Sequence, residues 1–210
     1  MAEGEVTPKA MLCACLLAAA VACLLGLYLV YTGGVVILVI GLTALLFAWL
    51  YTATPFSLSY LGIADIFVFL YYGVIACSGT AYLLLCGEEH TDGWNATILS
   101  SVYAGAVSGC ISMCVLMINN LRDIVSDRTV GKRTFPVRFG KNAAHIFLFI
   151  IVLLMPLFAY LAFRSPLPML VFIPAFVLWM KIIRSEGAAY NKCLVFAGMI
   201  NLIYLILCCL

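Results

Sequence analysis

The chain has 210 residues, of which 66% are hydrophobic and only 10% are charged. A soluble domain is about 45–50% apolar and about 25% charged, whereas the mean hydropathy here is +1.19. This composition excludes a soluble enzyme, a disordered protein and a nucleic-acid binder, because too little polar surface is present to cover a soluble globule. The net charge of +2 is small, and its information lies in where the charges fall.

Apolar runs separated by polar, glycine or proline breaks predict a helical membrane protein. A span needs about 20 mostly apolar residues, so a chain of this length holds about seven. We expect an all-α polytopic bundle that forms a single domain over residues 1–210 and is surrounded by the lipid bilayer. In chain order the predicted spans are 11–31, 34–51, 63–86, 97–118, 143–163, 167–183 and 191–210.

The basic residues divide unequally between the two sides that seven spans define. Ten of the eleven fall on the side of the N-terminus and of the breaks at 52–62, 119–142 and 181–192. Only Arg164 falls on the other side, together with the acidic segment 88–92. Because Lys and Arg accumulate in cytoplasmic loops, we expect the N-terminus and the 119–142 loop in the cytoplasm and the C-terminus outside.

The segment from Asn119 to Arg128 carries the most ordered polar pattern. We expect the fourth span to continue as a helix into the interface, which places Asp123 and Asp127, four residues apart, on one face. Asn119 lies one turn earlier on that face, and Asn120 is beside it. Two carboxylates and an amide are hard oxygen ligands of the kind that Mg²⁺ takes. Asp123, Asp127 and Asn119 are therefore candidate magnesium ligands.

Cations accompany these acids along the same segment. Arg122, Arg128, Lys132 and Arg133 supply guanidinium forks, which bind phosphate oxygens in a bidentate way, and an ammonium point charge. Carboxylates for a metal followed at once by cations suit a metal-bound diphosphate at the membrane surface. The alternative is that the basic residues only orient the protein in the membrane, with the acids as their local ion-pair partners.

A second candidate region surrounds the break at 52–62. Asp65 is the only acidic residue at the start of an otherwise uncharged span, and an ionisable group at that depth is a functional candidate. Tyr51 and Tyr60 flank the same break, which carries no Lys or Arg. Both tyrosines fit either a site or the aromatic belt of a membrane interface.

The pattern resembles the UbiA superfamily of membrane prenyltransferases, and within it the 1,4-dihydroxy-2-naphthoate polyprenyltransferases of menaquinone synthesis. Residues 119–140 are similar to the second Asp-rich motif of that family and its continuation, and 51–65 resemble the loop before the next span. The start, 4–9, resembles the segment that follows the first Asp-rich motif. That first motif and two helices before it are absent here, so we expect a truncated chain with little or no activity by itself.

The resemblance implies a reaction and a role for each candidate. The reaction is Mg²⁺-dependent transfer of a polyprenyl group from polyprenyl diphosphate to an aromatic, naphthoate-type acceptor, in a multi-pass protein of a bacterial inner membrane. An inactive or incomplete family member and a small membrane transporter are the alternatives. The implied catalytic residues are Asp123, Asp127, Asp65 and Tyr51, and the implied substrate-binding residues are Asn119, Asn120, Arg122, Arg128, Lys132, Arg133 and Tyr60.

Overall fold

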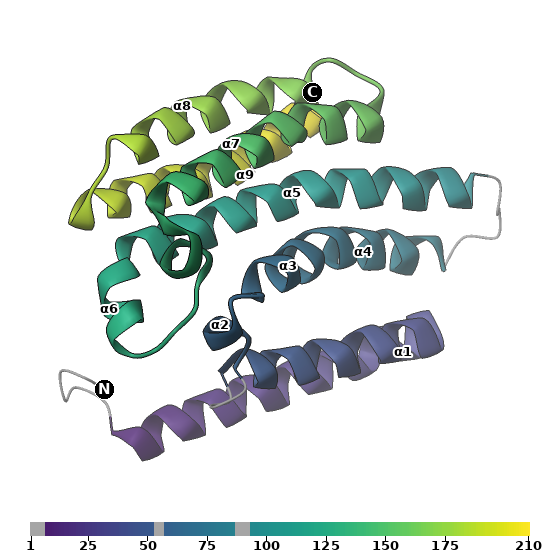
Figure 1. Cartoon of the computed structure of the whole chain (residues 1–210). Helices are drawn as coiled ribbons and strands as arrows, with labels where there is room; N and C mark the ends of the chain where they lie inside the picture. The colour runs from purple at the N-terminus through teal and green to yellow at the C-terminus, as the bar shows by residue number, and fades with distance from the viewer. Residues whose placement is uncertain (1–6, 53–56, 87–92) are drawn as a thin grey trace.

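The structure is a computed structural model that describes residues 7–52, 57–86 and 93–210. Over these residues it contains helices and their connections and no strand, as predicted for an all-α bundle (Figure 1). Pro55 of the second break and the acidic segment 88–92 lie outside the described residues. The elements are α1 (Pro8–Thr52), α2 (Leu58–Leu61), α3 (Ala64–Phe69), the π-helical turn η1 (Leu70–Ile75), α4 (Ala76–Leu85), α5 (Trp94–Arg122), α6 (Ile124–Thr129), α7 (Phe135–Phe163), the 3₁₀ turn η2 (Pro168–Val171), α8 (Phe172–Ile183), the 3₁₀ turn η3 (Gly187–Ala189) and α9 (Tyr190–Cys209).

Helix α1 contains the first two predicted spans and bends sharply between them. Gly34 has φ 63° and ψ −149°, a conformation that glycine adopts without the penalty of a Cβ atom. Figure 1 shows the chain running out along one arm of α1 and returning along the other. The Tyr82 hydroxyl donates a hydrogen bond to the Gly33 carbonyl at 3.3 Å, which ties the bend to α4. The boundary predicted between residues 31 and 34 coincides with this bend.

The span formed by α3, η1 and α4 packs on α5 through backbone atoms. A Cβ atom added at Gly73 would lie 2.5 Å from the Gly105 carbonyl oxygen and 2.5 Å from the Gly109 Cα atom. One added at Gly109 would lie 2.7 Å from the Phe69 carbonyl oxygen. In lipid the hydrophobic effect does not hold helices together, so their association depends on van der Waals packing. Glycines allow the close backbone contact that this packing needs. These glycines set how near the span carrying Asp65 comes to α5.

The tightest core lies among α5, α7, α8 and α9. The Trp179 indole N–H donates to the His145 carbonyl at 2.9 Å, so a polar group inside this core is satisfied across two helices. In α1, by contrast, nearly all large apolar side chains are exposed, as lipid permits. Fully buried side chains of the core, one from each helix, are Ile111, Leu148, Leu178 and Ile200.

Helix α7 begins earlier than the predicted span at 143–163. It starts at Phe135 with a proline in its first turn, and it bends at Gly140, which has φ 83° and ψ 168°. The first turn of α7 therefore belongs to the polar segment after α5 and not to the long apolar helix. The bend at Gly140 returns the chain to the bundle, where α7 packs against α5 and α6.

Five helices in the described part of the chain are long and apolar enough to cross a membrane, and Pro168–Ile183 is a shorter apolar helix. Helix α1 is one of the five, and its two arms correspond to two predicted spans. These six helices therefore account for the seven predicted spans. Figure 1 shows the start of α1, α2, α6 and the connection from α8 to α9 at one end of the bundle. The end of α4, the connection from α7 to α8 and the C-terminus lie at the other end. We call the first of these the basic end, since the predicted basic loops meet there.

Candidate functional site

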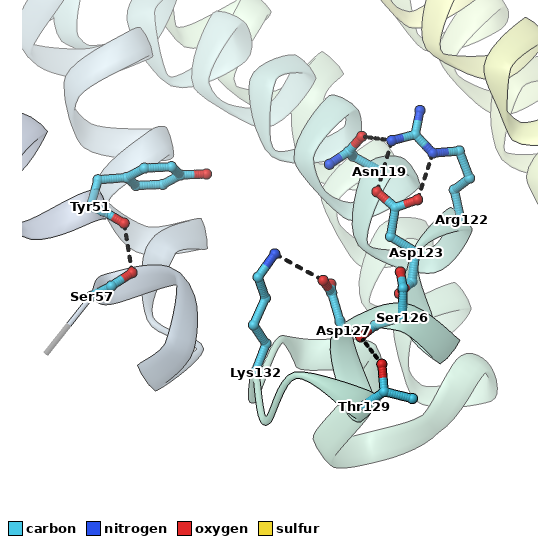
Figure 2. A network of polar contacts seen from close by, with 9 residues as sticks. All are labelled: Tyr51, Ser57, Asn119, Arg122, Asp123, Ser126, Asp127, Thr129 and Lys132. Carbon is cyan, nitrogen blue, oxygen red and sulfur yellow. Dashed lines mark hydrogen bonds and ion pairs between the residues drawn. The ribbon is translucent and has the colours of Figure 1, made fainter. Parts of the chain in front are cut away.

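The polar segment after α5 is bent, which corrects the prediction of a continuous helix. Helix α5 ends at Arg122, Asp123 has φ −97° and ψ 12°, and α6 starts at Ile124. Aspartate is a poor helix former because its carboxylate competes for local hydrogen bonds, and here both of its oxygens bind the neighbouring Arg122. Hydrogen bonds with helical spacing remain on both sides of the break. The Asp123 N–H donates to the Asn119 carbonyl at 3.0 Å, and the Asp127 N–H donates to the Asp123 carbonyl at 2.8 Å. The two carboxylates nevertheless point to different partners (Figure 2).

Asp127 is held beside Lys132 by the turn that ends α6. Gly131 adopts the left-handed conformation with φ 77°, and its N–H donates to the Arg128 carbonyl at 3.3 Å. The Lys132 N–H donates to the Asp127 carbonyl at 3.0 Å, which completes a Schellman motif. The turn brings Lys132 Nζ to 2.9 Å from Asp127 Oδ1 (Figure 2). This contact raises the pKa of Lys132, and the Asp127 side chain is only 8% exposed.

Arg122 gathers the other polar groups at the end of α5. Its Nε and Nη2 atoms donate to the two Asp123 oxygens at 2.8 and 2.7 Å, and Nη2 also donates to Asn119 Oδ1 at 2.7 Å. Its Nη1 atom donates to Asn191 Oδ1 of α9 at 3.0 Å. The hydrogen bonds from Arg122 lower the pKa of Asp123, and the charge of Lys132 lowers it further. Asp123 is therefore kept ionised and oriented.

The short helix α2 meets the loop after α6 at the basic end. The Arg133 N–H donates to the Tyr60 carbonyl at 3.1 Å. Gly62 ends α2 in the left-handed conformation with φ 74°, and a Cβ atom there would overlap the Arg133 carbonyl oxygen. These backbone contacts fix the loop that carries Lys132 against α2. Lys132 consequently interacts electrostatically with Tyr60 as well as with both aspartates.

An apolar cavity of about 920 Å³ lies next to these polar groups, between the second arm of α1, the α3–η1 segment and α5. Tyr51 and Asn119 both line it. The Tyr51 ring projects from α1 into the space that faces Asn119 and Lys132, and its backbone carbonyl accepts a 2.7 Å hydrogen bond from Ser57 (Figure 2). Tyr51 also interacts electrostatically with Lys132 and Asp65. The cavity is therefore apolar inside, and at Asn119 and Tyr51 it borders the charged groups Arg122 and Lys132. We call this border the charged mouth.

Aromatic side chains that the sequence analysis did not single out form one wall of this cavity. The ring centroids of Phe47 and Phe67 are 4.3 Å apart, and those of Phe47 and Tyr71 are 5.2 Å apart. All three residues line the cavity. A signal was present, because Phe47 and Tyr51 are four residues apart, as are Phe67 and Tyr71, and this spacing places each pair on one helix face.

The remaining candidates differ in their relation to the cavity. Asp65 is buried in the first turn of α3, and its Oδ1 atom has no hydrogen-bond partner among the described residues. Asn120 is buried on α5, but it does not line the cavity as Asn119 does. Arg128 and Arg133 are exposed. The structure thus brings most of the predicted residues to one end of the bundle, and neither Asp65 nor Asn120 lines the cavity.

The donor atoms fit a hard divalent cation. In the described part of the chain, no group of three or more His, Cys, Asp or Glu residues forms a closed metal centre. The donors are instead carboxylate oxygens of Asp123 and Asp127 and the Asn119 amide oxygen, and each already binds a cationic side chain. Mg²⁺ is usually held by one or two carboxylates, with water and phosphate completing its ligands. The donor chemistry is thus that of a hard divalent cation, while each of these oxygens is turned toward Arg122 or Lys132 in this structure.

The sequence matches the UbiA prenyltransferase family over residues 1–203. The chain belongs to this family. The assignment agrees with the resemblance carried by 119–140, and the helical bundle agrees with the fold that the resemblance implied. No solved structure matches the chain.

Curated proteins similar to this UbiA-family chain include 1,4-dihydroxy-2-naphthoate octaprenyltransferases of three bacteria. The protein of Escherichia coli (strain K12) is 33% identical over 147 residues, which cover 67% of this chain and 45% of that protein. The Mycobacterium leprae (strain TN) protein is 31% identical over 133 residues, 63% of this chain and 42% of that protein. The Haemophilus influenzae protein is 34% identical over 125 residues, which cover 59% of this chain and 37% of that protein. The chain spans less than half the length of these relatives.

Proposed function

We propose that the protein transfers a polyprenyl group from a polyprenyl diphosphate to an aromatic acceptor, and that the acceptor is 1,4-dihydroxy-2-naphthoate, which its relatives carry in their names. The observation that supports this most directly is the charged mouth on an apolar, aromatic-lined cavity of about 920 Å³. A diphosphate needs cations and a prenyl chain needs apolar walls. The two environments adjoin each other where α1, α2 and α5 meet.

The charged mouth would bind the diphosphate. Asp123 and Asp127, with Asn119, would hold Mg²⁺, which would neutralise the negative charge that develops on the leaving diphosphate. Lys132 is 34% exposed and flexible, so its ammonium can turn from Asp127 toward a phosphate oxygen. The exposed Arg128 and Arg133 and the Arg122 that orients Asp123 add positive charge to the same surface, beside Tyr60.

The cavity would hold the prenyl carbon that reacts and the acceptor ring. The aromatic wall of Phe47, Phe67 and Tyr71 excludes water and faces the positive charge that develops on an allylic carbon. A desolvated cation over an aromatic face gains up to about 2 kcal/mol. Tyr51 lines the cavity and interacts electrostatically with the buried Asp65, so Tyr51 would contact an acceptor hydroxyl and Asp65 would act on it through Tyr51.

We also propose that residues 1–210 act as one domain of a bacterial inner membrane, with the basic end in the cytoplasm. The support is the unequal division of Lys and Arg between the two ends of the bundle. Single cysteines at Lys132 and Arg164, introduced into a variant without other cysteines, should react with an impermeant reagent from opposite sides. Reaction of both from one side would contradict this orientation.

The central test is substrate binding by the chain in lipid nanodiscs, because we expect little or no transfer by residues 1–210 alone. We expect octaprenyl diphosphate to bind more tightly with Mg²⁺ than without it, and we expect prenylated naphthoate as the product of an N-terminally extended enzyme that carries both Asp-rich motifs. Diphosphate binding that does not respond to Mg²⁺ would count against the proposal. Ion flux in proteoliposomes without any diphosphate binding would favour the transporter alternative.

A further inference from the structure

We propose that Asn191, in the first turn of α9, is a positioning residue for the charged mouth and acts on it through Arg122. The Arg122 Nη1 atom donates a hydrogen bond to Asn191 Oδ1 at 3.0 Å. Asn191 is not among the residues that the sequence analysis indicated, and it does not itself line the cavity. The inference rests on the proposed function, because it concerns the orientation of the groups that would hold the metal and the diphosphate.

The guanidinium of Arg122 holds two candidate metal ligands in one arrangement (Figure 2). Its Nη2 atom donates to Asn119 Oδ1 and to Asp123 Oδ2, both at 2.7 Å, so one nitrogen keeps these two oxygens near each other. Its Nε atom donates to Asp123 Oδ1 at 2.8 Å. An amide or carboxylate oxygen carries two lone pairs, so each of the three oxygens keeps one that a cation can use. The orientation of Arg122 therefore sets where Asn119 and Asp123 present their oxygens.

Asn191 fixes this guanidinium from outside the helix end that carries it. Asn119, Arg122 and Asp123 all lie where α5 stops, and helix ends fray, so bonds among these three residues move together with that end. Asn191 is 69 residues from Arg122 in the chain and belongs to α9. Among the described residues it is the acceptor from another helix that Arg122 binds. A planar guanidinium that is held on this further side cannot rotate without losing a bond.

The start of α9 is a firm support for this contact. Tyr190 and Cys193, on either side of Asn191 in the chain, are almost completely buried in the core. The Cys193 Sγ atom also lies 3.5 Å from the hydroxyl of Ser185, which follows α8. Leu194, in the next turn of α9, lines the cavity. The first turns of α9 therefore join the core, the edge of the cavity and the Arg122 side chain.

The exposure of the contact favours a role in orientation over a role in stability. Asn191 is exposed and the Arg122 side chain is 31% exposed, so water can replace the hydrogen bond when it is lost. Water does not hold the guanidinium in one direction, whereas a binding site works best when neighbouring contacts already hold its groups in place. Within the described part of the chain, Arg122 uses four of the five N–H groups of a guanidinium. The fifth lies on Nη1, the atom that Asn191 holds, so Asn191 sets its direction too.

The experiment is a double-mutant cycle that measures the binding of farnesyl diphosphate to the chain in nanodiscs by calorimetry, with and without Mg²⁺. The variants are Asn191→Leu, Arg122→Met and the two combined, and thermal unfolding in detergent is followed on the same preparations. We expect Asn191→Leu to weaken Mg²⁺-dependent binding about tenfold, which is about 1.4 kcal/mol, and to leave the unfolding temperature nearly unchanged. In the Arg122→Met background the same substitution should have no further effect, since Asn191 acts through Arg122.

Two further variants accompany the cycle. Asn191→Ala removes the same acceptor oxygen without the bulk of a leucine, so it should weaken Mg²⁺-dependent binding as much as Asn191→Leu does. Asn201→Leu makes the matched substitution further along α9, at a residue that does not line the cavity. It should leave the binding of farnesyl diphosphate unchanged.

Each contrary outcome has a distinct meaning. Wild-type binding by both Asn191 variants would overturn the positioning role. An equal loss on Asn191→Leu with and without Arg122 would show that Asn191 does not act through Arg122, which overturns it as well. A lower unfolding temperature with unchanged binding per folded molecule would show only a structural link between α5 and α9. Binding by the wild type that does not respond to Mg²⁺ would instead refute the proposed function, and the inference with it.

Discussion

Replacing Asp127 by asparagine tests whether this carboxylate acts on the substrate or only pairs with Lys132. The substitution removes one negative charge and keeps an oxygen at the position that lies 2.9 Å from Lys132 Nζ. The Lys132 side chain is 34% exposed and regains water, so we expect the free energy of unfolding to fall by about 1 kcal/mol or less. If Asp127 holds the metal and diphosphate, turnover of an N-terminally extended enzyme that carries both Asp-rich motifs should fall about 10²–10³-fold, which is roughly 3–4 kcal/mol of transition-state stabilisation.

Lys132→Met is the matched variant, because it breaks the same ion pair from the other side. It leaves the Asp127 carboxylate, whose side chain is 8% exposed, without its cation, so it should cost more stability than Asp127→Asn. We expect it to keep Mg²⁺-dependent binding of diphosphate, at lower affinity. Thermal unfolding in detergent, Mg²⁺-dependent binding and turnover are measured on the same preparations. Equal turnover per folded molecule in both variants, close to that of the wild type, would show that the pair is only structural.

Three further outcomes follow from the geometry. Gly73→Ala places a Cβ atom 2.5 Å from the α5 backbone and should lower the free energy of unfolding by about 1–3 kcal/mol, measured by denaturation in detergent, whereas Gly198→Ala should not. Gly131→Ala strains a residue with φ 77° by about 1–2 kcal/mol and should weaken diphosphate binding, which calorimetry would detect. Arg122→Met removes the contact that lowers the pKa of Asp123. A lowered pKa keeps the carboxylate charged until the pH falls through it, so binding by this variant should decline at a higher pH than in the wild type.

The apolar segments could be predicted from the sequence because lipid imposes one strong rule. Every backbone group must be bonded within a span, so long apolar runs become helices and their breaks become ends. The break at 32–34 is an example, since Gly34 bends α1 where hydropathy alone showed only a short interruption. The bend at Gly140 was not predicted, because the neighbouring residues are polar enough to pass for a loop.

The contacts that build the site were less accessible to sequence reasoning. Asp127 and Lys132 are five residues apart, and their contact depends on the left-handed Gly131, a helix-ending pattern that the sequence did carry. The contact between Tyr60 and Arg133 joins segments far apart in the chain and has no local signal. The helix break at Asp123 likewise depends on the Arg122 side chain, which helical spacing does not anticipate.

The location of the candidate site at helix ends follows from the cost of polar groups in lipid. Unpaired backbone and charged side chains are tolerated only where protein or water surrounds them. The structure places its irregular backbone there, with α5 interrupted at Asp123, α6 ended at Gly131 and α2 ended at Gly62. The breaks at Asp123 and Gly131 hold the ion pairs Arg122–Asp123 and Lys132–Asp127 near the cavity, while the apolar wall of the cavity comes from the spans. A reaction that joins a charged diphosphate to a lipid-like chain needs this boundary, so the same helix ends that satisfy the membrane also suit the proposed chemistry.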